Sequence, residues 1–540
     1  MARAMMRSCS EDLAEYFLKH HPLVVQCGVG VPDGAAKAYH AITTLLPSFP
    51  AGHVPSPGEL NNPIVLLSLD AKNAFNCISR QGMFDALFGT ASKWYDEGEV
   101  APGSTIDTPA ILRPFLQFLA AHYSRDANLG YTARDTDGRL YVKGRAGVQQ
   151  GDPPSSSLFS FGLHPVLVRT LDRFPGVYAV AYCDNVFLVG HLDHALACAD
   201  DLVVRLKADL DLDVNLAQSW VHAPAWAHLP AAPASYAPTL ASFPNLPDLP
   251  VALEGAKVLG LPVGSDHFCK EFLVSKAAKI TAELEPIRHV DDGRHFAQLV
   301  RFCVKTQLGF TLRSALPSHT SPAASQLDAA ATAAVGEYVT GQAGWEPASL
   351  RDDPTSHDCA SLILQLSSSR GGWGLTPLEG AADPAFYAGY AEFLRWTQTS
   401  VPSLLAFHTS QVTPGADLRL STHPPVRHLV RIHNALVADC DALVVPPDPP
   451  AQPPAGTLVL PALGSILLDS AEPRVPRQRH VTKAHMQHWQ LHIDILRRPA
   501  CVDKLKDLLD AQKEQLIDVE TPDLSPLIGS VVHLTKGTVS

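Results

Sequence analysis

The chain has 540 residues, of which 46% are hydrophobic, and its 54 acidic and 42 basic side chains give a net charge of −12. This acidic balance argues against a strong overall grip on nucleic acid, because affinity for phosphate comes largely from Lys and Arg. No apolar run reaches the roughly 18 residues of a membrane span, and the first ten residues lack the apolar core of a signal peptide. We therefore expect a protein without a membrane partner that is cytoplasmic or nuclear and not secreted.

An apolar run at residues 64–69 predicts a buried strand, and the strand ends at an acid. Asp70 follows the run directly and opens the segment Asp-Ala-Lys-Asn-Ala-Phe, which ends at Phe75. Taken alone, Asp70 is more typical of an ordinary turn at a strand end, because Asp hydrogen-bonds to nearby backbone in turns.

A loop with the letters GVQQGDPPSSS follows at residues 147–157 and leads into an apolar helical stretch that runs through Leu167. Gln150 and Gly151 lie at its centre. Taken alone, Gly151 is an ordinary turn glycine before a helix whose first turn holds Pro153.

A strand-turn-strand pattern comes next, because the apolar runs 177–181 and 186–190 flank the polar tetrapeptide Tyr-Cys-Asp-Asn at 182–185. The pattern predicts a hairpin with Asp184 in its turn. Two strands that end in acids can share a pair of divalent cations, and carboxylate oxygens are the ligands that Mg²⁺ prefers.

In this order and at this spacing the three segments resemble the palm of reverse transcriptases of the non-LTR retrotransposon type. Two more segments resemble the same family: residues 26–34 look like the Gln-x-Gly segment before the first palm strand, and residues 258–264 look like the hairpin that grips the primer. Residues 301–303 and 371–375 resemble its thumb and the region after it. The resemblance covers about residues 20 to 400. It implies an α+β fold, a right-hand polymerase palm made of an antiparallel sheet with packed helices, plus a helical thumb.

The resemblance also implies an RNA-directed DNA polymerase, a nucleotidyltransferase that uses two Mg²⁺ ions or Mn²⁺, with an RNA template, a DNA primer and dNTP as partners. Phe75 then excludes a 2′-hydroxyl by size, and its alternative is a core aromatic at the start of a helix. The implied roles are catalysis by Asp70, Asp184 and Asn185; metal binding by Asp70, the Ala71 carbonyl and Asp184; nucleotide binding by Phe75, Gln150 and Gly151; and primer contact by Tyr182, Gly260 and Gly264.

Three departures from the family pattern favour an N-terminally truncated and partly degenerate enzyme. Asn185 stands where the family has Asp, and Gln218 stands where a Lys often protonates pyrophosphate. Only some 25 residues precede Gln26, which we expect to be too few for the fingers strands. The alternative is a non-catalytic remnant that at most binds nucleic acid. An RNA polymerase is a third interpretation, and Phe75 argues against it.

Composition and periodicity predict the domain organisation. Basic residues between 270 and 313 fall where a thumb touches the duplex backbone, although a solvated helix face explains them equally well. The expected segments are 1–62, remnant of fingers and entry to the palm; 63–222, palm; 223–250, Pro/Ala-rich insertion; 251–268, primer-grip-like hairpin; 269–345, helical thumb; 346–445, C-terminal helical extension; 446–454, Pro-rich linker; and 455–540, tail of unknown role.

Overall fold

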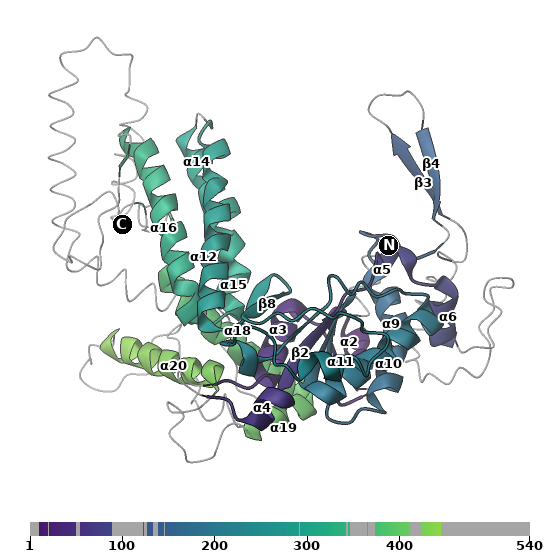
Figure 1. Ribbon diagram of the computed structural model, residues 1–540. Coiled ribbons are helices and arrows are strands. Elements are labelled where there is room, and N and C mark those ends of the chain that lie inside the picture. The colour runs from purple at the N-terminus through teal and green to yellow at the C-terminus, as the bar shows by residue number, and fades with distance from the viewer. Residues whose placement is uncertain are drawn as a thin grey trace, which may run out of the picture. The chain divides into compact units, whose positions relative to one another are not determined.

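The computed structural model divides the chain into two compact units (Figure 1). The first comprises Met1–Cys269 with Glu392–Arg427, and the second comprises Lys270–Ala391 with His428–Ser465 among its segments. The structure describes residues 10–19, 21–49, 54–88, 123, 127–132, 139–144, 146–290, 292–341, 344–345, 364, 373–410 and 423–443. The expected linker 446–454 and tail 455–540 lie outside these residues.

The first unit is built on a five-stranded sheet with the strand order β1-β5-β6-β2-β7. The strands are β1 (Val24–Gln26), β5 (Tyr178–Tyr182), β6 (Asn185–His191), β2 (Ile64–Leu69) and β7 (Trp220–His222). Strands β5, β6, β2 and β7 pair antiparallel, but β1 runs parallel to β5. The expected antiparallel sheet is therefore wrong at this edge, because a strand of only three residues carries no local signal of its direction.

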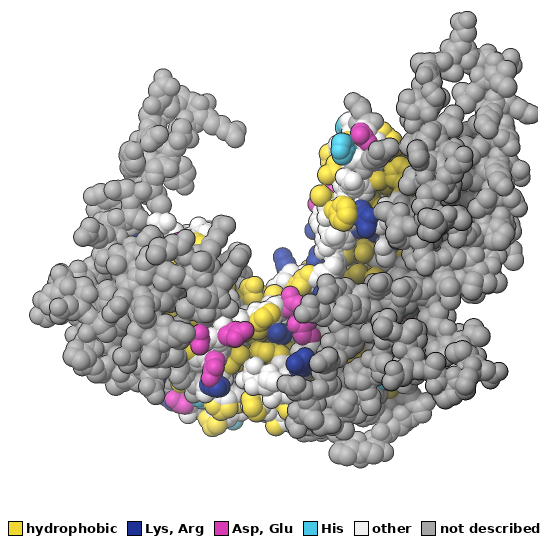
Figure 2. Space-filling model, turned by 180° about the vertical axis from the view of Figure 1, so that it is seen from behind, with side chains coloured by type: hydrophobic (Ala, Val, Ile, Leu, Met, Phe, Trp, Pro, Cys, Tyr) yellow, Lys and Arg dark blue, Asp and Glu magenta, His cyan; other side chains and the backbone are white. Residues whose placement is uncertain are grey.

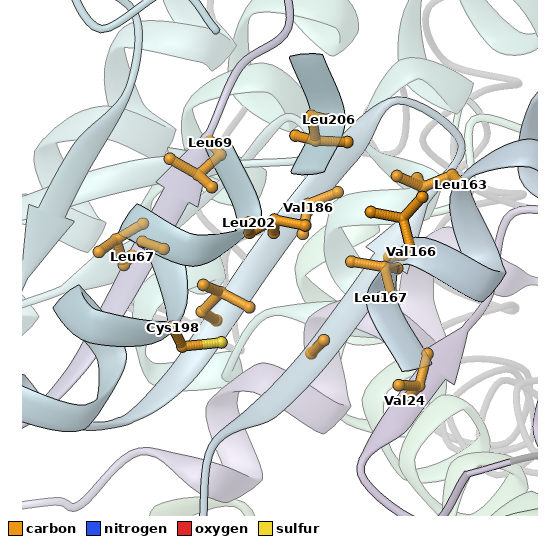
Figure 3. Packing of buried hydrophobic residues seen from close by; sticks show 14 of the residues in the cluster. Val24, Leu67, Leu69, Leu163, Val166, Leu167, Val186, Cys198, Leu202 and Leu206 are labelled. Atoms are coloured by element: carbon orange, nitrogen blue, oxygen red, sulfur yellow. The ribbon is translucent and has the colours of Figure 1, made fainter. Parts of the chain in front are cut away.

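Helices α9 (Ser155–Leu171) and α10 (Leu192–Leu210) pack on the sheet through apolar side chains (Figure 3). Each large aliphatic side chain buried in this way stabilises the fold by about 1.5–3 kcal/mol. Sheet residues whose side chains point to the other face, such as Val180, Phe187 and Val189, are buried as well. Both faces of the sheet are therefore covered. The side chains labelled in Figure 3 are Leu163, Val166 and Leu167 of α9, Cys198, Leu202 and Leu206 of α10, and Val24, Leu67, Leu69 and Val186 of the sheet.

Further elements complete the first unit. Helices α2 and α3 flank β1, and α3 contacts β5, β6 and α19. Among the described strands, β3 pairs with β4 and β8 pairs with β9, each pair forming a separate two-stranded sheet. The bounds are α2 (Ser10–Lys19), α3 (Gly34–Leu45), α4 (Pro57–Asn61), α5 (Ala74–Cys77), α6 (Arg80–Phe88), β3 (Ala127–Thr132), β4 (Arg139–Gly144), η2 (Pro224–Trp226), α11 (Tyr236–Leu240), β8 (Gly255–Val258), β9 (Leu261–Gly264) and α19 (Pro402–Ser410).

The Pro/Ala-rich stretch 223–250 packs into the core of the first unit. Trp226 is completely buried, and its indole N–H donates to the carbonyl oxygen of Leu60 at 3.0 Å. The Tyr236 hydroxyl donates to the carbonyl oxygen of Leu249 at 2.9 Å, and both residues belong to the main hydrophobic cluster. Although its composition is that of a linker, the stretch therefore adds to the stability of the fold.

The described part of the second unit is helical, and the stretch 265–345, predicted to be helical, carries most of it. Its core includes Phe296, Val300, Leu312 and Leu327. None of the described helices is long and apolar enough to cross a membrane. Helices α12, α18 and α20 each extend across a boundary between the two units. The bounds are α12 (Asp266–Ala282), α13 (Leu284–Ile287), α14 (Gly293–Leu299), the π-helix η3 (Val300–Val304), the 3₁₀-helix η4 (Lys305–Leu308), α15 (Gly309–Ser314), α16 (Pro317–Thr340), α18 (Leu378–Ser400) and α20 (Pro424–Leu443).

The basic residues of this stretch have different surroundings. Lys305, expected on a duplex-facing surface, is buried instead, and its Nζ lies 2.7 Å from the Asp328 carboxylate. Arg288 lies 3.4 Å from the Glu337 carboxylate, whereas Lys270 and Lys279 are exposed. Figure 2 shows basic and acidic side chains interspersed on the described face. The prediction of a basic surface is thus wrong for Lys305 and stays a prediction for the exposed residues.

The pH dependence of stability tests the burial of His222 in β7. The side chain is completely buried with Nδ1 at 2.7 Å from the Ala252 carbonyl oxygen, and burial lowers the pKa of His222 below its ordinary 6.5. The unfolded chain therefore takes up the proton more readily, so this residue costs stability as the pH falls through 6.5. Between about pH 7.5 and about pH 5.5, the free energy of unfolding in urea should therefore fall less in His222→Asn than in the unmodified chain. Equal losses in both proteins would contradict this account.

Candidate functional site

The pairing of β2 with β6 brings the two predicted acids to one edge of the sheet. Leu69 at the end of β2 pairs with Val186 near the start of β6, and Tyr182 pairs with Asn185 to close the β5–β6 hairpin. Asp70 therefore leaves its strand beside the turn that holds Asp184. Both side chains are partly exposed, and the site opens to solvent at this edge.

The two carboxylates repel each other. Burial raises the pKa of Asp184 above its ordinary value, and the negative charge of Asp70 raises it further. The Nδ2 amide of Asn185 donates to Oδ1 of Asp184 at 3.3 Å, so this neutral neighbour is itself in contact with the acid. A cation held between them would offset this repulsion, because both carboxylates would then face a positive charge.

The segment 26–34 packs against the β5–β6 turn that holds Asp184. The Cys27 N–H donates to the Ala181 carbonyl at 2.8 Å. A Cβ at Gly28 would lie 2.4 Å from the backbone nitrogen of Cys183, so only glycine allows this approach. Cys183 has a φ of +54°, a left-handed conformation that costs energy for a non-glycine residue. The segment that resembled a family motif in the sequence thus lies directly against the hairpin turn.

The loop that carries Gln150 and Gly151 is tied to the segment after Asp70. The Val148 N–H donates to the Phe75 carbonyl at 2.6 Å, and the Gly147 N–H donates to the Ile78 carbonyl at 2.9 Å. Gln150 and Gly151 are exposed. Gly151 has a φ of +85°, and no described atom lies within 4 Å of where its Cβ would be. The positive φ of the turn explains why position 151 is a glycine, and the space beside this residue is open.

Phe75 is intermediate between a core residue and a surface residue. The side chain is partly exposed, and its ring stacks on the buried ring of Phe159 with centroids 4.9 Å apart and planes 16° apart. One face of the ring is therefore held by the core. This geometry agrees with both interpretations of Phe75, because a fixed ring can pack and can also limit the space beside it.

The predicted primer-contacting residues have structural explanations of their own. The β8–β9 turn has positive φ at Leu259 and Gly260, as the favoured two-residue hairpin turns require. A Cβ at Gly264 would lie 2.3 Å from the Glu254 carbonyl oxygen. The Tyr39 hydroxyl of α3 donates to the Pro262 carbonyl at 2.8 Å and fixes the hairpin. Tyr182 is partly exposed next to the hairpin turn, and burial raises its pKa. Contact of Tyr182, Gly260 and Gly264 with a primer stays a prediction.

Arg80 and Tyr123 stabilise the loop that carries Gln150 and Gly151. The sequence analysis did not identify either of them as a residue of the site. The buried Arg80 guanidinium donates to the carbonyl oxygens of Gly147 at 2.9 Å and Gly144 at 3.1 Å, and it lies 5.5 Å from the ring centroid of Tyr123. The Tyr123 hydroxyl donates to Oδ2 of Asp152 at 2.6 Å, and burial raises its pKa to about 12. No local motif marks these residues, because the hydrogen-bond partners named here lie at least 29 positions away and the nearest further one, Gln149, lies 26 positions from Tyr123.

Ser219 is a third supporting residue to which the sequence assigned no role. Its hydroxyl accepts a hydrogen bond from the backbone N–H of Asp70 at 3.0 Å. The neighbouring Gln218 accepts through Oε1 from the Asn215 amide at 2.8 Å. Among the described residues, no three or more His, Cys, Asp or Glu side chains gather to hold a metal. The candidate donors are therefore the acid pair and neighbouring backbone.

Comparisons with known proteins add little to this geometry. No family model matches the sequence, and no curated protein matches it. A solved structure of telomerase from Candida albicans, in complex with a TWJ fragment of telomeric RNA, aligns with a TM-score of 0.35 and 12% identity. The alignment covers 80% of this chain and 58% of that chain. A similarity of this size carries no argument, so the function must be inferred from the residues of the site.

Removal of the charge at position 184 should stabilise the fold. The folded-state pKa of Asp184 lies above its ordinary value of 3.8, so ionisation at neutral pH costs stability, and this cost disappears once the group is protonated. We expect Asp184→Asn to raise the Tm by about 1–3 °C near pH 7 and to have a smaller effect as the pH falls toward 4. The matched control is Asp248→Asn, an exposed position that should leave the Tm unchanged. A lower Tm for Asp184→Asn, measured by calorimetry, would rule out the repulsion.

Proposed function

We propose that the chain is a reverse-transcriptase-like, RNA-directed DNA polymerase of retrotransposon type, and that its five-stranded sheet is the palm. The observation that carries the proposal is the meeting of Asp70 and Asp184 at one sheet edge, near enough for the charge of one to raise the pKa of the other. Two acids on neighbouring strands are the arrangement that two-metal nucleotidyl transfer requires.

The donor atoms suit Mg²⁺ or Mn²⁺. Both acids offer hard oxygen atoms, which these ions prefer over nitrogen and sulfur. In the antiparallel bridge of Ala71 with Val214, the hydrogen bonds run through the neighbours of Ala71, from Lys72 N–H and to Asp70 C=O. The Ala71 carbonyl is therefore directed away from the ladder, which agrees with its proposed role. Burial raises the pKa of the Cys183 thiol, which keeps this neighbour protonated and a poor ligand.

The remaining roles follow from the chemistry of the chain's own residues. Two cations at this edge would activate a primer 3′-hydroxyl and neutralise the charge on the triphosphate. The Phe75 ring, held by Phe159, limits the space at the 2′ position of the sugar and so favours dNTP over rNTP. Gln150 and Gly151 present an exposed, open surface to the nascent base pair. RNA template and DNA primer are the partners that this function requires.

A non-catalytic nucleic-acid-binding protein is the second candidate, and two observations favour it. Asn185 supplies a neutral amide in place of a carboxylate and uses its N–H on Asp184. Gln218 cannot protonate pyrophosphate, and its side chain is engaged by Asn215. Each loss typically lowers a rate by roughly 10² or more. The proposed enzyme is therefore slow, and the experiments must separate a slow polymerase from an inactive one.

Binding of Mn²⁺ tests the metal site without activity. We expect saturable binding, followed by the electron paramagnetic resonance signal of free Mn²⁺, that weakens at least about tenfold in Asp70→Asn and in Asp184→Asn. Each change removes a unit charge that lies a few Å from the ion. Asp248→Asn is the matched control and should bind as the unmodified chain does. Unaltered affinity in both site variants would remove the two-metal hypothesis.

Repair of the two departures tests the polymerase itself. We expect Asn185→Asp combined with Gln218→Lys to raise primer extension on an RNA template by about 10²-fold or more, because it restores a ligand charge and a general acid. Addition of Asp184→Asn to the repaired chain should abolish the gain, which excludes a contaminating enzyme. Absence of cDNA from the repaired chain would favour the second candidate. Extension at ordinary rates by the unmodified chain would show that these positions are not lesions.

A further inference from the structure

The ladder between β2 and its neighbour β7 is interrupted next to Asp70. Ser68 pairs with Trp220 in the regular ladder, and Ala71 forms an isolated bridge with Val214. Between these two pairs, β2 contributes residues 69–70, whereas the opposite chain contributes residues 215–219. The longer side therefore bulges out at the point where Asp70 needs an acceptor for its backbone N–H.

The Ser219 hydroxyl supplies this acceptor and closes a ring of hydrogen bonds. The Asp70 N–H donates to Ser219 Oγ at 3.0 Å, and Ser219 Oγ donates to the Asn215 carbonyl at 2.9 Å. The Asn215 N–H then donates to the Asp70 carbonyl at 2.7 Å. Both polar groups of the Asp70 backbone are thus bound to the same bulge. The Lys72 N–H donates to the Asp213 carbonyl at 2.8 Å and extends this contact by one residue.

We propose that Ser219 is a positioning residue that fixes the backbone of Asp70, and with it the direction of the carboxylate toward the hairpin turn. The inference rests on the proposed function, because it assigns Ser219 a role in the metal site. Ser219 is 1% exposed, so bulk solvent does not reach its hydroxyl in the folded chain, and a side chain without an oxygen leaves the Asp70 N–H without this acceptor. A backbone shift of a fraction of an ångström matters at a metal site, where ligand geometry is exacting.

The bulge also links Asp70 to the residue in place of the family Lys. Gln218 directly precedes Ser219, and its N–H donates to the Asn215 carbonyl at 3.0 Å, the same oxygen that accepts from the Ser219 hydroxyl. Positions 70 and 218 are therefore held by one turn. Ser219 acts on the metal site through this backbone and does not itself contact the reacting atoms.

The experiment compares Ser219→Ala, Ser219→Thr and Ser160→Ala in the full chain. Ser160 is the matched control, because it is a buried serine whose hydroxyl has no hydrogen-bond partner among the described residues. Hydrogen exchange followed by mass spectrometry at residue level measures the exchange rate of the Asp70 amide. Titration with Mn²⁺ measures the affinity of the metal site. We expect Ser219→Ala to speed exchange at Asp70 by roughly 10-fold and to weaken Mn²⁺ binding by roughly 5-fold. Ser219→Thr, which keeps the hydroxyl, should restore both, and Ser160→Ala should alter neither.

The two readouts separate failure of this inference from failure of the proposed function. Unchanged Asp70 exchange in Ser219→Ala overturns the inference, as does faster exchange with unchanged Mn²⁺ affinity or a Thr variant that behaves like Ala. If the unmodified chain binds no Mn²⁺, the proposed function is wrong, and the exchange measurement alone then decides whether Ser219 anchors the end of β2. A general loss of protection from exchange across β5 and β6 in Ser219→Ala indicates that this variant does not fold. The Asp70 exchange rate and the Mn²⁺ affinity of Ser219→Thr then decide whether the inference holds.

Discussion

The antiparallel pairing of β2 with β6 is the interaction on which the candidate site depends. Six consecutive pairs, from Ile64 with His191 to Leu69 with Val186, set the register. A slip of one residue would turn every side chain of β2 to the other face of the sheet and place polar Ser68 in the apolar layer that Leu67 and Leu69 now fill. The apolar layer under α9 and α10 prevents such a slip, because Leu67, Leu69 and Val186 already fill it. Core packing thus places Asp70 beside Asp184.

The sheet edge that carries Asp70 and Asp184 lowers the free energy of unfolding. Two carboxylates lie close together, Cys183 adopts a left-handed backbone conformation, and Gly28 approaches the turn so closely that no side chain fits. Nothing in the packing requires an acid pair at this place, since neutral residues would remove the repulsion. Strain and repulsion that surrounding structure must offset are typical of binding sites. Left-handed residues and tight glycines also occur in the β8–β9 hairpin, so the repulsion between the two acids is the physical reason to propose a function for this edge.

The sequence predicted the parts of the site that local patterns encode. The apolar runs became β2, β5 and β6, the Gly-Asp-Pro loop led into α9, and Asp184 lies in a tight turn. The supporting contacts could not be predicted. Arg80 binds the carbonyl of Gly147, 67 positions away, and Ser219 binds the N–H of Asp70, 149 positions away, so neither residue carries a local signal. The parallel direction of β1 and the burial of Lys305 also depend on distant partners. The expected domain boundaries and the primer and template contacts stay predictions.

The location of a bound cation tests the central claim most directly. Crystals grown with Mn²⁺ and measured at the manganese absorption edge give an anomalous difference map that shows where the ion lies, independent of any activity. The account predicts a peak within about 2–2.5 Å of carboxylate oxygens from both Asp70 and Asp184. An ordered site edge with no peak, or a peak that only one of the two acids contacts, would contradict a shared metal site.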